Sequence, residues 1–265
     1  MIYNKLNLFE EIKKTINSKE YNIRKSSGIN FTKKIEKEKI TLENKKEIFN
    51  NIYFNGTIYL TEFDTEEKID EIIILLESVL GKTINNKNKY NNKYEIITAI
   101  ENPQWFFESH YSQPVHTDEG HEKIQPNILA LYCKENSEFG GDNILVNSKL
   151  IYKLLIEKYG DKVDLLFHND CITCIKKNNE FTKNIFLKIK ENIGISFSPL
   201  INEFKCTQEI YEMLKDINYL IHQKENQIFF KLKENQCIIF SNYLYLHSRT
   251  FFPKNSKRTL YRIWF

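Results

Sequence analysis

The sequence has no apolar run long enough to cross a membrane. Hydrophobic stretches such as 72–76 and 128–133 are far shorter than the roughly 20 residues that a membrane helix needs. The N-terminal residues also lack the apolar core of a signal peptide. We therefore expect a cytoplasmic protein with no membrane partner.

Cysteine is scarce, and its pattern excludes a disulfide scaffold. The five cysteines form an odd and scattered set, namely Cys133, Cys171, Cys174, Cys206 and Cys237. The one C-x-x-C spacing, from Cys171 to Cys174, lacks the second pair that a zinc site needs. It favours buried thiols over metal or redox chemistry.

The chain also lacks an excess of charge of either sign. Lys and Arg number 38 against 35 for Asp and Glu, which leaves a formal net charge of +3. Such a balance gives no reason to expect nucleic acid as a partner. No linker or internal repeat is visible, so we predict a single domain over residues 1–265 and leave its oligomeric state open.

Helical spacing is present in four segments. A first helix carries Phe9, Ile12 and Ile16, with Asn7 as its cap, and two more are expected at 148–159 and from Thr207 onward. For a further helix, Asp64 and Glu67 resemble a capping box before the apolar stripe of Ile69, Ile72, Ile73 and Leu76. Residues 52–60 are predicted to form a strand before it. The Asn-, Lys- and Tyr-only stretch 85–94 is predicted to be a loop, whose role the sequence leaves open.

Alternating apolar residues predict several short strands in the second half of the chain. They are Ile193, Ile195 and Phe197; Ile228, Phe230 and Leu232; Ile238 and Phe240; and Tyr261, Ile263 and Phe265. Many short strands with a few covering helices indicate a mostly β protein with α elaborations. The expected fold is a double-stranded β-helix, or jelly roll, flanked by helices.

The chemistry of the chain is indicated by His116-Thr117-Asp118 and by His247 far downstream. Two imidazoles and one carboxylate are the protein ligands of the facial triad that holds non-haem Fe(II). On a β-strand, His116 and Asp118 would project from one face while Thr117 points the other way. The third ligand can come from any strand that crosses the same pocket.

The order of the surrounding motifs resembles that of a known family. Gln113-Pro114-Val115 precedes the triad, Gly140-Gly141-Asp142-Asn143 follows it, and the run from Asn242 through His247 ends with Arg258 and Arg262. From about residue 113 to the end, this pattern is similar to the taurine dioxygenase-like (TauD/TfdA, clavaminate synthase-like) oxygenases. The resemblance implies an enzyme that uses Fe(II), 2-oxoglutarate as co-substrate and O₂.

The resemblance also implies roles for individual residues. His116, Asp118 and His247 become the iron ligands, and Arg258 becomes the partner of the distal carboxylate of 2-oxoglutarate, which suits a planar guanidinium. Arg262 shares a strand face with Arg258 and is expected to hold an anionic group of the substrate.

Three further positions complete the predicted pocket. Asn143 stands where relatives have a threonine that helps to bind the co-substrate, so its amide is expected to replace that hydroxyl. His110 and Gln113 precede the triad and are expected to line the substrate pocket, although simple packing explains them equally well. Arg249 has the same strand parity as His247 and is equally compatible with a structural role.

Retention of Asp118 favours hydroxylation, because halogenating relatives replace this carboxylate with a small residue. We therefore predict hydroxylation of a C–H bond in a small polar, carboxylate-bearing molecule such as an amino acid or natural-product intermediate. Desaturation, isonitrile formation, and peptide or RNA hydroxylation remain open alternatives for the same site. A non-catalytic metal-binding jelly roll is a further alternative, and the identity of the substrate and its pathway is not determined by the sequence.

Overall fold

The computed structural model describes residues 2–4, 8–22, 33–34, 42–64, 66–84, 93–176, 179–200 and 203–265. The helices are α1 (Leu8–Ile16), α2 (Lys19–Asn22), α3 (Leu42–Tyr53), α4 (Ile69–Leu80), α5 (Ser148–Tyr159) and α6 (Gln208–Ile221), with 3-10 helices η2 (Phe106–Glu108), η3 (Gly160–Phe167) and η4 (Lys224–Asn226). The strands are β1 (Ile2–Asn4), β2 (Lys33–Lys34), β3 (Tyr59–Glu62), β4 (Glu95–Thr98), β5 (Ile128–Glu135), β6 (Asn143–Asn147), β7 (Ile172–Lys176), β8 (Asn179–Lys183), β9 (Phe186–Ile189), β10 (Asn192–Ile195), β11 (Phe204–Cys206), β12 (Ile228–Phe230), β13 (Gln236–Ser241), β14 (Tyr245–Arg249) and β15 (Thr259–Trp264).

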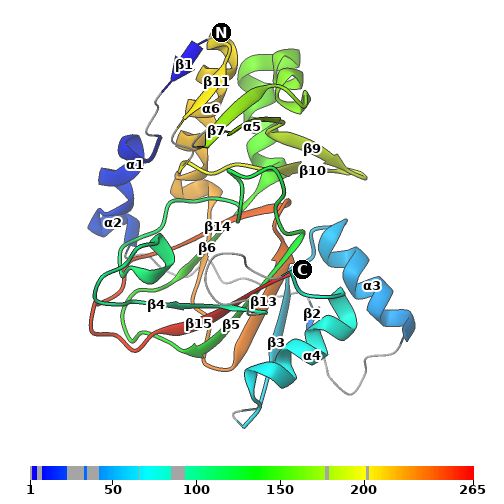
Figure 1. Ribbon diagram of the computed structural model, residues 1–265, viewed down its shortest axis with the longest axis vertical. Coiled ribbons are helices and arrows are strands. Elements are labelled where there is room, and N and C mark those ends of the chain that lie inside the picture. The colour runs from blue at the N-terminus through cyan, green and yellow to red at the C-terminus, as the bar shows by residue number, and fades with distance from the viewer. Residues whose placement is uncertain are drawn as a thin grey trace.

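Two sheets form the centre of the molecule (Figure 1). One has six strands in the order β2-β3-β13-β5-β15-β4, and the other has three in the order β12-β6-β14. Alternate residues of β5 explain how the sheets pack, because Leu129 and Leu131 join the apolar cluster that also contains Leu145 of β6. Ile128 and Ala130 point away, toward the opposite face. The cluster between the sheets is the interior of the jelly roll, as predicted from the sequence.

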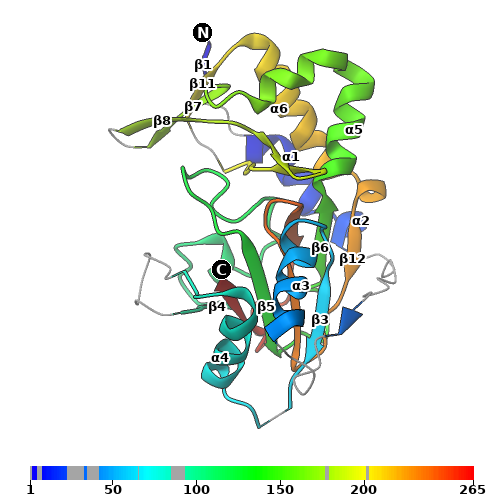
Figure 2. The same ribbon diagram turned by 90° about the vertical axis from the view of Figure 1, so that its right-hand side faces the viewer.

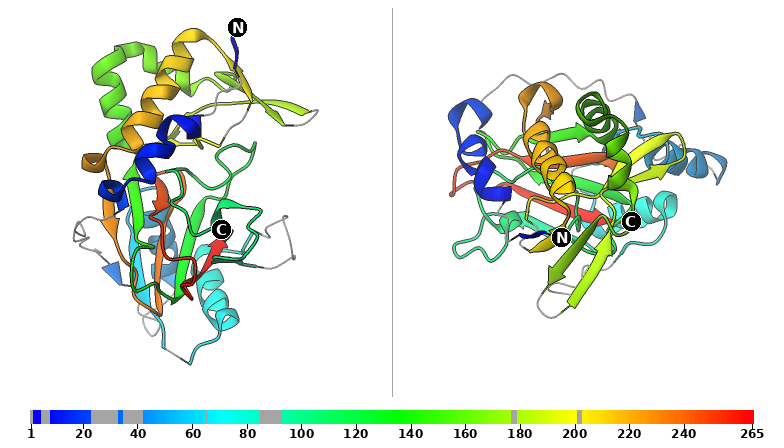
Figure 3. Two further views of the ribbon diagram at one scale, coloured as in Figure 1. Left: turned by 90° about the vertical axis from the view of Figure 1, so that its left-hand side faces the viewer. Right: turned by 90° about the horizontal axis from the view of Figure 1, so that it is seen from above.

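Helices cover the outer face of each sheet. The helices α3 and α4 lie against the six-stranded sheet (Figure 2), where Ile72 and Leu76 of α4 share a buried cluster with Ala130 and Ile263. A second layer lies at the other end of the molecule and contains α5, α6, the sheet β1-β11-β7-β8 and the hairpin β9-β10 (Figure 3). It buries a separate apolar cluster against the outward side of β6 and β14.

Several sequence predictions are confirmed by this architecture. The helix α5 begins after Asn147, whose side-chain oxygen accepts hydrogen bonds from two backbone N–H groups, and it ends at Gly160 with a φ of 57°. Thr207 caps α6 in the same way. All five cysteines are buried and free. Among the described helices, none has the length and apolar character needed to cross a bilayer.

Two local predictions near the N-terminus are wrong. Residues 52–60 are not one strand, because Ile52 and Tyr53 end α3, and Gly56, with a φ of 70°, separates them from β3. The capping residue of α4 is Lys68, whose N–H donates to the Glu71 carboxylate at 3.2 Å, so the predicted box at 64–67 lies four residues too early.

Some predictions stay predictions. The proposed cap Asn7 and most of the 85–94 stretch lie outside the described residues. The single domain over residues 1–265 likewise remains a prediction.

Candidate active site

The two histidines of the motif lie opposite each other across a two-bond bridge. The His116 N–H donates to the His247 carbonyl at 3.0 Å, and the His247 N–H returns a bond of 2.8 Å to the His116 carbonyl. His247 belongs to β14 and has the same parity as Tyr245, which points into the interior between the sheets. The bridge therefore places both imidazoles on the interior side, with ring centroids 4.5 Å apart.

Asp118 reaches the histidines from a turn and not from a strand, which corrects the sequence prediction. Among 116–118 only His116 is paired with another strand, and the chain turns after it through Glu119, whose φ is 54°. Asn242 holds this turn. Its side-chain oxygen accepts from the Asp118 N–H at 2.9 Å, and its amide nitrogen donates to the carbonyls of Asp118 and Pro126, each at 3.0 Å.

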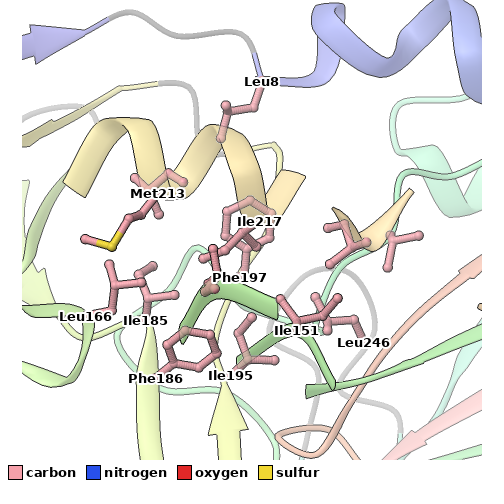
Figure 4. Close-up of a cluster of buried hydrophobic side chains, with 14 of the residues drawn as sticks. Leu8, Ile151, Leu166, Ile185, Phe186, Ile195, Phe197, Met213, Ile217 and Leu246 are labelled. Carbon is pink, nitrogen blue, oxygen red and sulfur yellow. The ribbon is translucent and has the colours of Figure 1, made fainter. Parts of the chain in front are cut away.

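Thr117 points away from the histidines, as predicted, and connects the turn to the helical layer. The Thr117 N–H donates to the Phe197 carbonyl at 2.8 Å, and the Thr117 hydroxyl accepts from the Phe197 N–H at 3.1 Å. Figure 4 shows the Phe197 ring among Ile195, Ile217 and other apolar side chains of that layer. The buried ammonium of Lys183 adds a bond to the Gly120 carbonyl at 2.5 Å. The helical core thus anchors the turn that carries Asp118.

The ligand atoms of the three side chains converge. Asp118 Oδ1 lies 3.5 Å from His116 Nε2 and 3.6 Å from His247 Nε2. The His116 Nδ1 lies 2.8 Å from the Pro114 carbonyl, a contact that needs a proton on Nδ1 and so leaves the Nε2 lone pair directed at the cluster. Two imidazole nitrogens and one carboxylate oxygen on one side of a point are the donor set of a facial triad.

Two further side chains donate hydrogen bonds to the Asp118 carboxylate. Arg262 Nη1 donates to its Oδ1 at 2.7 Å, and Trp264 Nε1 donates to its Oδ2 at 2.8 Å. Burial alone raises the pKa of Asp118, but the Arg262 charge and the two histidines outweigh it and hold this pKa well below its usual range. Burial lowers the pKa of His247 to about 4, so its imidazole is neutral and able to bind a metal.

A cavity of about 570 Å³ opens onto this cluster. His116, Asp118, Gln113 and Arg262 line it, together with aromatic side chains of 105–107 and several carboxylates from Glu95, Glu119, Glu122 and Glu203. Arg262 also forms an ion pair with Glu95 through Nη2, while its Nε is buried without a hydrogen-bond partner among the described residues. The cavity therefore places both signs of charge beside the triad.

Arg258 and Asn143 lie deeper in the interior. Arg258 is 1% exposed, immediately before β15, and its Nη2 donates to the Gly141 carbonyl at 3.1 Å. Burial lowers the pKa of Arg258 to about 10, with Cys133 and Asp142 opposing the shift. Asn143 is buried at the start of β6 and pairs with Arg249 across the ladder to β14.

The structure brings most predicted site residues together. The cavity is lined by His116, Asp118, Gln113 and Arg262. His247 belongs to the same cluster of ligand atoms as His116 and Asp118. His110 does not line the cavity, and its ring packs at a tilt against that of Tyr111 with ring centroids 4.2 Å apart.

Sequence reasoning missed the bonds made by Asn242 and Trp264. Strand parity places Trp264 on the same face as Arg262, so the signal for it was present. No local pattern marks the contact between Asn242 and the Asp118 turn.

Comparison with known proteins agrees with this geometry. The family model described as "Taurine catabolism dioxygenase TauD, TfdA family" matches residues 37–173 and 175–264. The chain belongs to the TauD/TfdA family. No curated protein matches the sequence significantly.

Solved structures share the fold of this TauD/TfdA chain at low sequence identity. An asparagine oxygenase in complex with Fe(II), 3-hydroxyasparagine and succinate is 12% identical, with a TM-score of 0.66 over 86% of this chain and 80% of that chain. The non-haem iron oxygenase OrfP with Fe, succinate and (3S)-hydroxy-L-Arg is 10% identical, with a TM-score of 0.66 over 86% of this chain and 82% of that chain. OrfP with Fe and alpha-ketoglutaric acid is 9% identical, with the same TM-score.

Family membership and the donor set together make this protein an Fe(II)/2-oxoglutarate-dependent dioxygenase, as the sequence predicted. The residues fit both groups. Two imidazoles and a carboxylate converge as iron ligands do, and the buried guanidinium of Arg258 has two N–H-bearing nitrogens, Nε and Nη1, without partners among the described residues. Such donors suit a carboxylate of the co-substrate.

Proposed function

We propose that this TauD/TfdA protein hydroxylates a C–H bond of a small polar molecule that carries a carboxylate, such as a free or tethered amino acid. The observation that supports this most directly is the mixed charge of the cavity beside the triad. Arg262 lies on its wall, and so do the carboxylates of Glu119 and Glu122. An amino acid presents an anionic and a cationic group to such a wall.

In this proposal His116, Asp118 and His247 bind iron, and Arg258 and Asn143 bind the co-substrate. Arg262, which lines the cavity, binds the substrate carboxylate while its Nη1 keeps the bond to Asp118. Gln113 contributes the cavity wall next to His116. His110 is the weakest of the proposed substrate contacts, because its ring lies outside the cavity lining.

Iron and 2-oxoglutarate, when bound, supply the oxidising chemistry with O₂. The residues of this chain position the substrate and keep water away. Phe106, Phe107 and Trp105 form an apolar side of the cavity, which favours a shielded reaction site. Asp118 retains the carboxylate that halogenating relatives lack, and this supports hydroxylation over halogenation.

The structural neighbours support the same substrate class. The printed complexes contain 3-hydroxyasparagine in one case and (3S)-hydroxy-L-Arg in another, which are hydroxylated amino acids bound with iron and succinate. At 10–12% identity the likeness itself shows the fold, so the substrate remains our proposal.

The test is succinate formation and oxygen consumption with a panel of amino acids. We expect one or more amino acids to stimulate succinate formation, and mass spectrometry to show a product that has gained one oxygen. A product that has lost two hydrogens would instead support desaturation.

The variant Arg258→Ala tests the assignment of Arg258 as the residue that binds the co-substrate. Arg258→Ala should lose succinate formation, and extra primary substrate should not restore it, because the co-substrate and not the substrate has lost its partner. Lys158→Ala, which removes an exposed cation of α5 paired with Asp216, serves as the control and should retain activity. Unchanged turnover in Arg258→Ala would refute the proposed site.

A further inference from the structure

Two buried arginines from opposite sheets lie over the same aromatic ring in the interior. Arg249 ends β14 of the three-stranded sheet, and Arg258 precedes β15 of the six-stranded sheet. They are 3% and 1% exposed, and both guanidinium groups lie over the ring of Phe252, at 4.7 Å and 5.2 Å from its centroid. Two like charges are therefore buried against one aromatic ring.

The protein satisfies only part of their hydrogen-bonding capacity. Arg249 Nη2 donates to the carbonyls of Phe106 and Ser109, and Arg258 Nη2 donates to that of Gly141. The Nε and Nη1 atoms of both arginines are buried and have no partner among the described residues. A buried charge with unmet donors is destabilising unless an anion accompanies it.

The carboxylate of Asp142 does not supply that anion. Asp142 is close enough to influence Arg258, but its side chain accepts from the Thr250 hydroxyl at 3.4 Å, and burial raises its pKa. No hydrogen bond joins Asp142 to either arginine in the described part of the chain. The pair therefore carries more positive charge than its protein neighbours balance.

Arg249 lies on the same face of β14 as the metal ligand His247. It follows His247 by two residues, so their Cα atoms are separated by roughly 6–7 Å. Asn143 lies directly across the ladder from Arg249. Gly141 leaves no room for a side chain, because an added Cβ would approach Arg258 Nε to 2.5 Å. The surroundings are an amide, a glycine backbone and two guanidinium groups.

We propose that Arg249 is a second anchor for the distal carboxylate of 2-oxoglutarate, which it shares with Arg258. This inference rests on the co-substrate role of Arg258 proposed above. A carboxylate has two oxygens with about four acceptor sites, enough for N–H donors from both forks. The second guanidinium supplies the charged contact here, where Asn143 replaces the threonine expected from the family pattern.

The experiment measures co-substrate affinity and needs no turnover. Protein saturated with Fe(II) is titrated anaerobically with 2-oxoglutarate or with 2-oxopentanoate, which has a methyl group in place of the distal carboxylate, and the weak visible charge-transfer band is followed. Wild type, Arg249→Gln, Arg249→Lys and Arg258→Lys are compared. Arg249→Lys keeps a positive charge and an aliphatic stem at this buried position, so it provides a folded variant if Arg249→Gln does not fold.

We expect Arg249→Gln to weaken 2-oxoglutarate binding about 10- to 100-fold, the loss typical of a hydrogen bond to a charged group. Arg249→Lys should show a smaller loss, and neither variant should change the affinity for 2-oxopentanoate. Equal weakening for both keto acids would assign Arg249 a purely structural role through its bonds to Phe106 and Ser109 and overturn the inference.

Two outcomes separate this inference from the proposed function. If Arg258→Lys discriminates between the keto acids and Arg249→Lys does not, the second anchor is refuted while the co-substrate site stands. If wild type gives no charge-transfer band with either acid, the proposed function fails, and the inference fails with it.

Discussion

The metal end and the anion end of this interior are built in opposite ways. At the metal end, Asp118 has both carboxylate oxygens hydrogen-bonded and its backbone N–H and carbonyl held by Asn242. At the anion end, Arg249 and Arg258 retain buried N–H groups without partners among the described residues. Protein groups therefore hold the metal ligand Asp118 on all sides, whereas Arg249 and Arg258 keep N–H donors that a ligand can use.

This contrast predicts where variants will act. Changes at the metal end should alter the stability of the free protein and its affinity for Fe(II), because protein groups lose protein partners there. Changes at the anion end should alter co-substrate affinity first.

The largest effect is expected for Asn242→Ala. It removes three hydrogen bonds at once and leaves buried backbone groups of Asp118 and Pro126 unsatisfied. We expect a loss of roughly 2–5 kcal/mol in the free energy of unfolding, measured by urea denaturation, together with weaker Fe(II) binding.

Asn147→Ala is the control for that variant. It removes the N-cap of α5 at a position that pairs with Tyr245 and not with a metal ligand, so it should lower stability by about 1 kcal/mol and leave Fe(II) affinity unchanged. If both variants bind Fe(II) like wild type, the metal end does not depend on the Asn242 clamp.

The next effect concerns pH. His222 is fully buried, accepts the Val115 N–H at its Nε2 at 2.9 Å, and so supports the segment that carries His116. Burial lowers its pKa from 6.5 to about 4. Between these values the unfolded chain binds more protons, so the stability is fully present above about pH 6.5 and is lost as the pH falls toward 4.

The expected loss is roughly 3 kcal/mol across that window, from about 1.4 kcal/mol per pKa unit. Urea unfolding of the chelator-treated protein at several pH values measures it, and His222→Gln should show a flatter dependence. The same slope in wild type and variant would show that His222 does not carry this linkage.

A smaller effect is expected for Trp264→Phe. The variant keeps an aromatic ring but removes the N–H that donates to Asp118 Oδ2, and loss of such a support typically weakens metal binding about 10- to 100-fold. Metal titration measures it. Tyr245→Phe, which loses the bond to the Gly56 carbonyl instead, should bind Fe(II) normally, and a similar loss in both would indicate a general packing effect.

The smallest effect is expected for Gly141→Ala, which is compared with Gly160→Ala. Gly141 and Gly160 both have positive φ, but only at Gly141 would a Cβ meet Arg258, whereas at Gly160 nothing described lies within 4 Å. Gly141→Ala should weaken 2-oxoglutarate binding about tenfold at saturating Fe(II), the loss of about one charged hydrogen bond.

Gly160→Ala should share the backbone penalty of about 1–2 kcal/mol and keep normal co-substrate affinity. Equal affinities in the two variants would mean that the Gly141 backbone does not position Arg258.

Much of the site was predictable because ligand chemistry needs particular residue types. His116, Asp118 and His247 could be named from donor identity together with the order of the surrounding motifs, and the alternation in β13 and β15 predicted strands correctly. The helix α3 was missed because Ile52 and Ile58 suggested alternation, although Ile48 and Ile52 have the four-residue spacing of a helix. Local apolar patterns at 52–60 fit both structures, and packing against β13 decided between them.

The amino-acid sequence alone determined the iron-binding chemistry, the family and the strand faces, because these depend on side-chain identity and on a period of two. Only the tertiary structure decided that Asn242 holds the Asp118 turn, that Trp264 donates to its carboxylate, and that Arg249 and Arg258 both lie over Phe252. Each of these contacts joins segments that are distant in the chain or lie on different sheets. Their geometry is set by how the sheets pack, which no local pattern encodes.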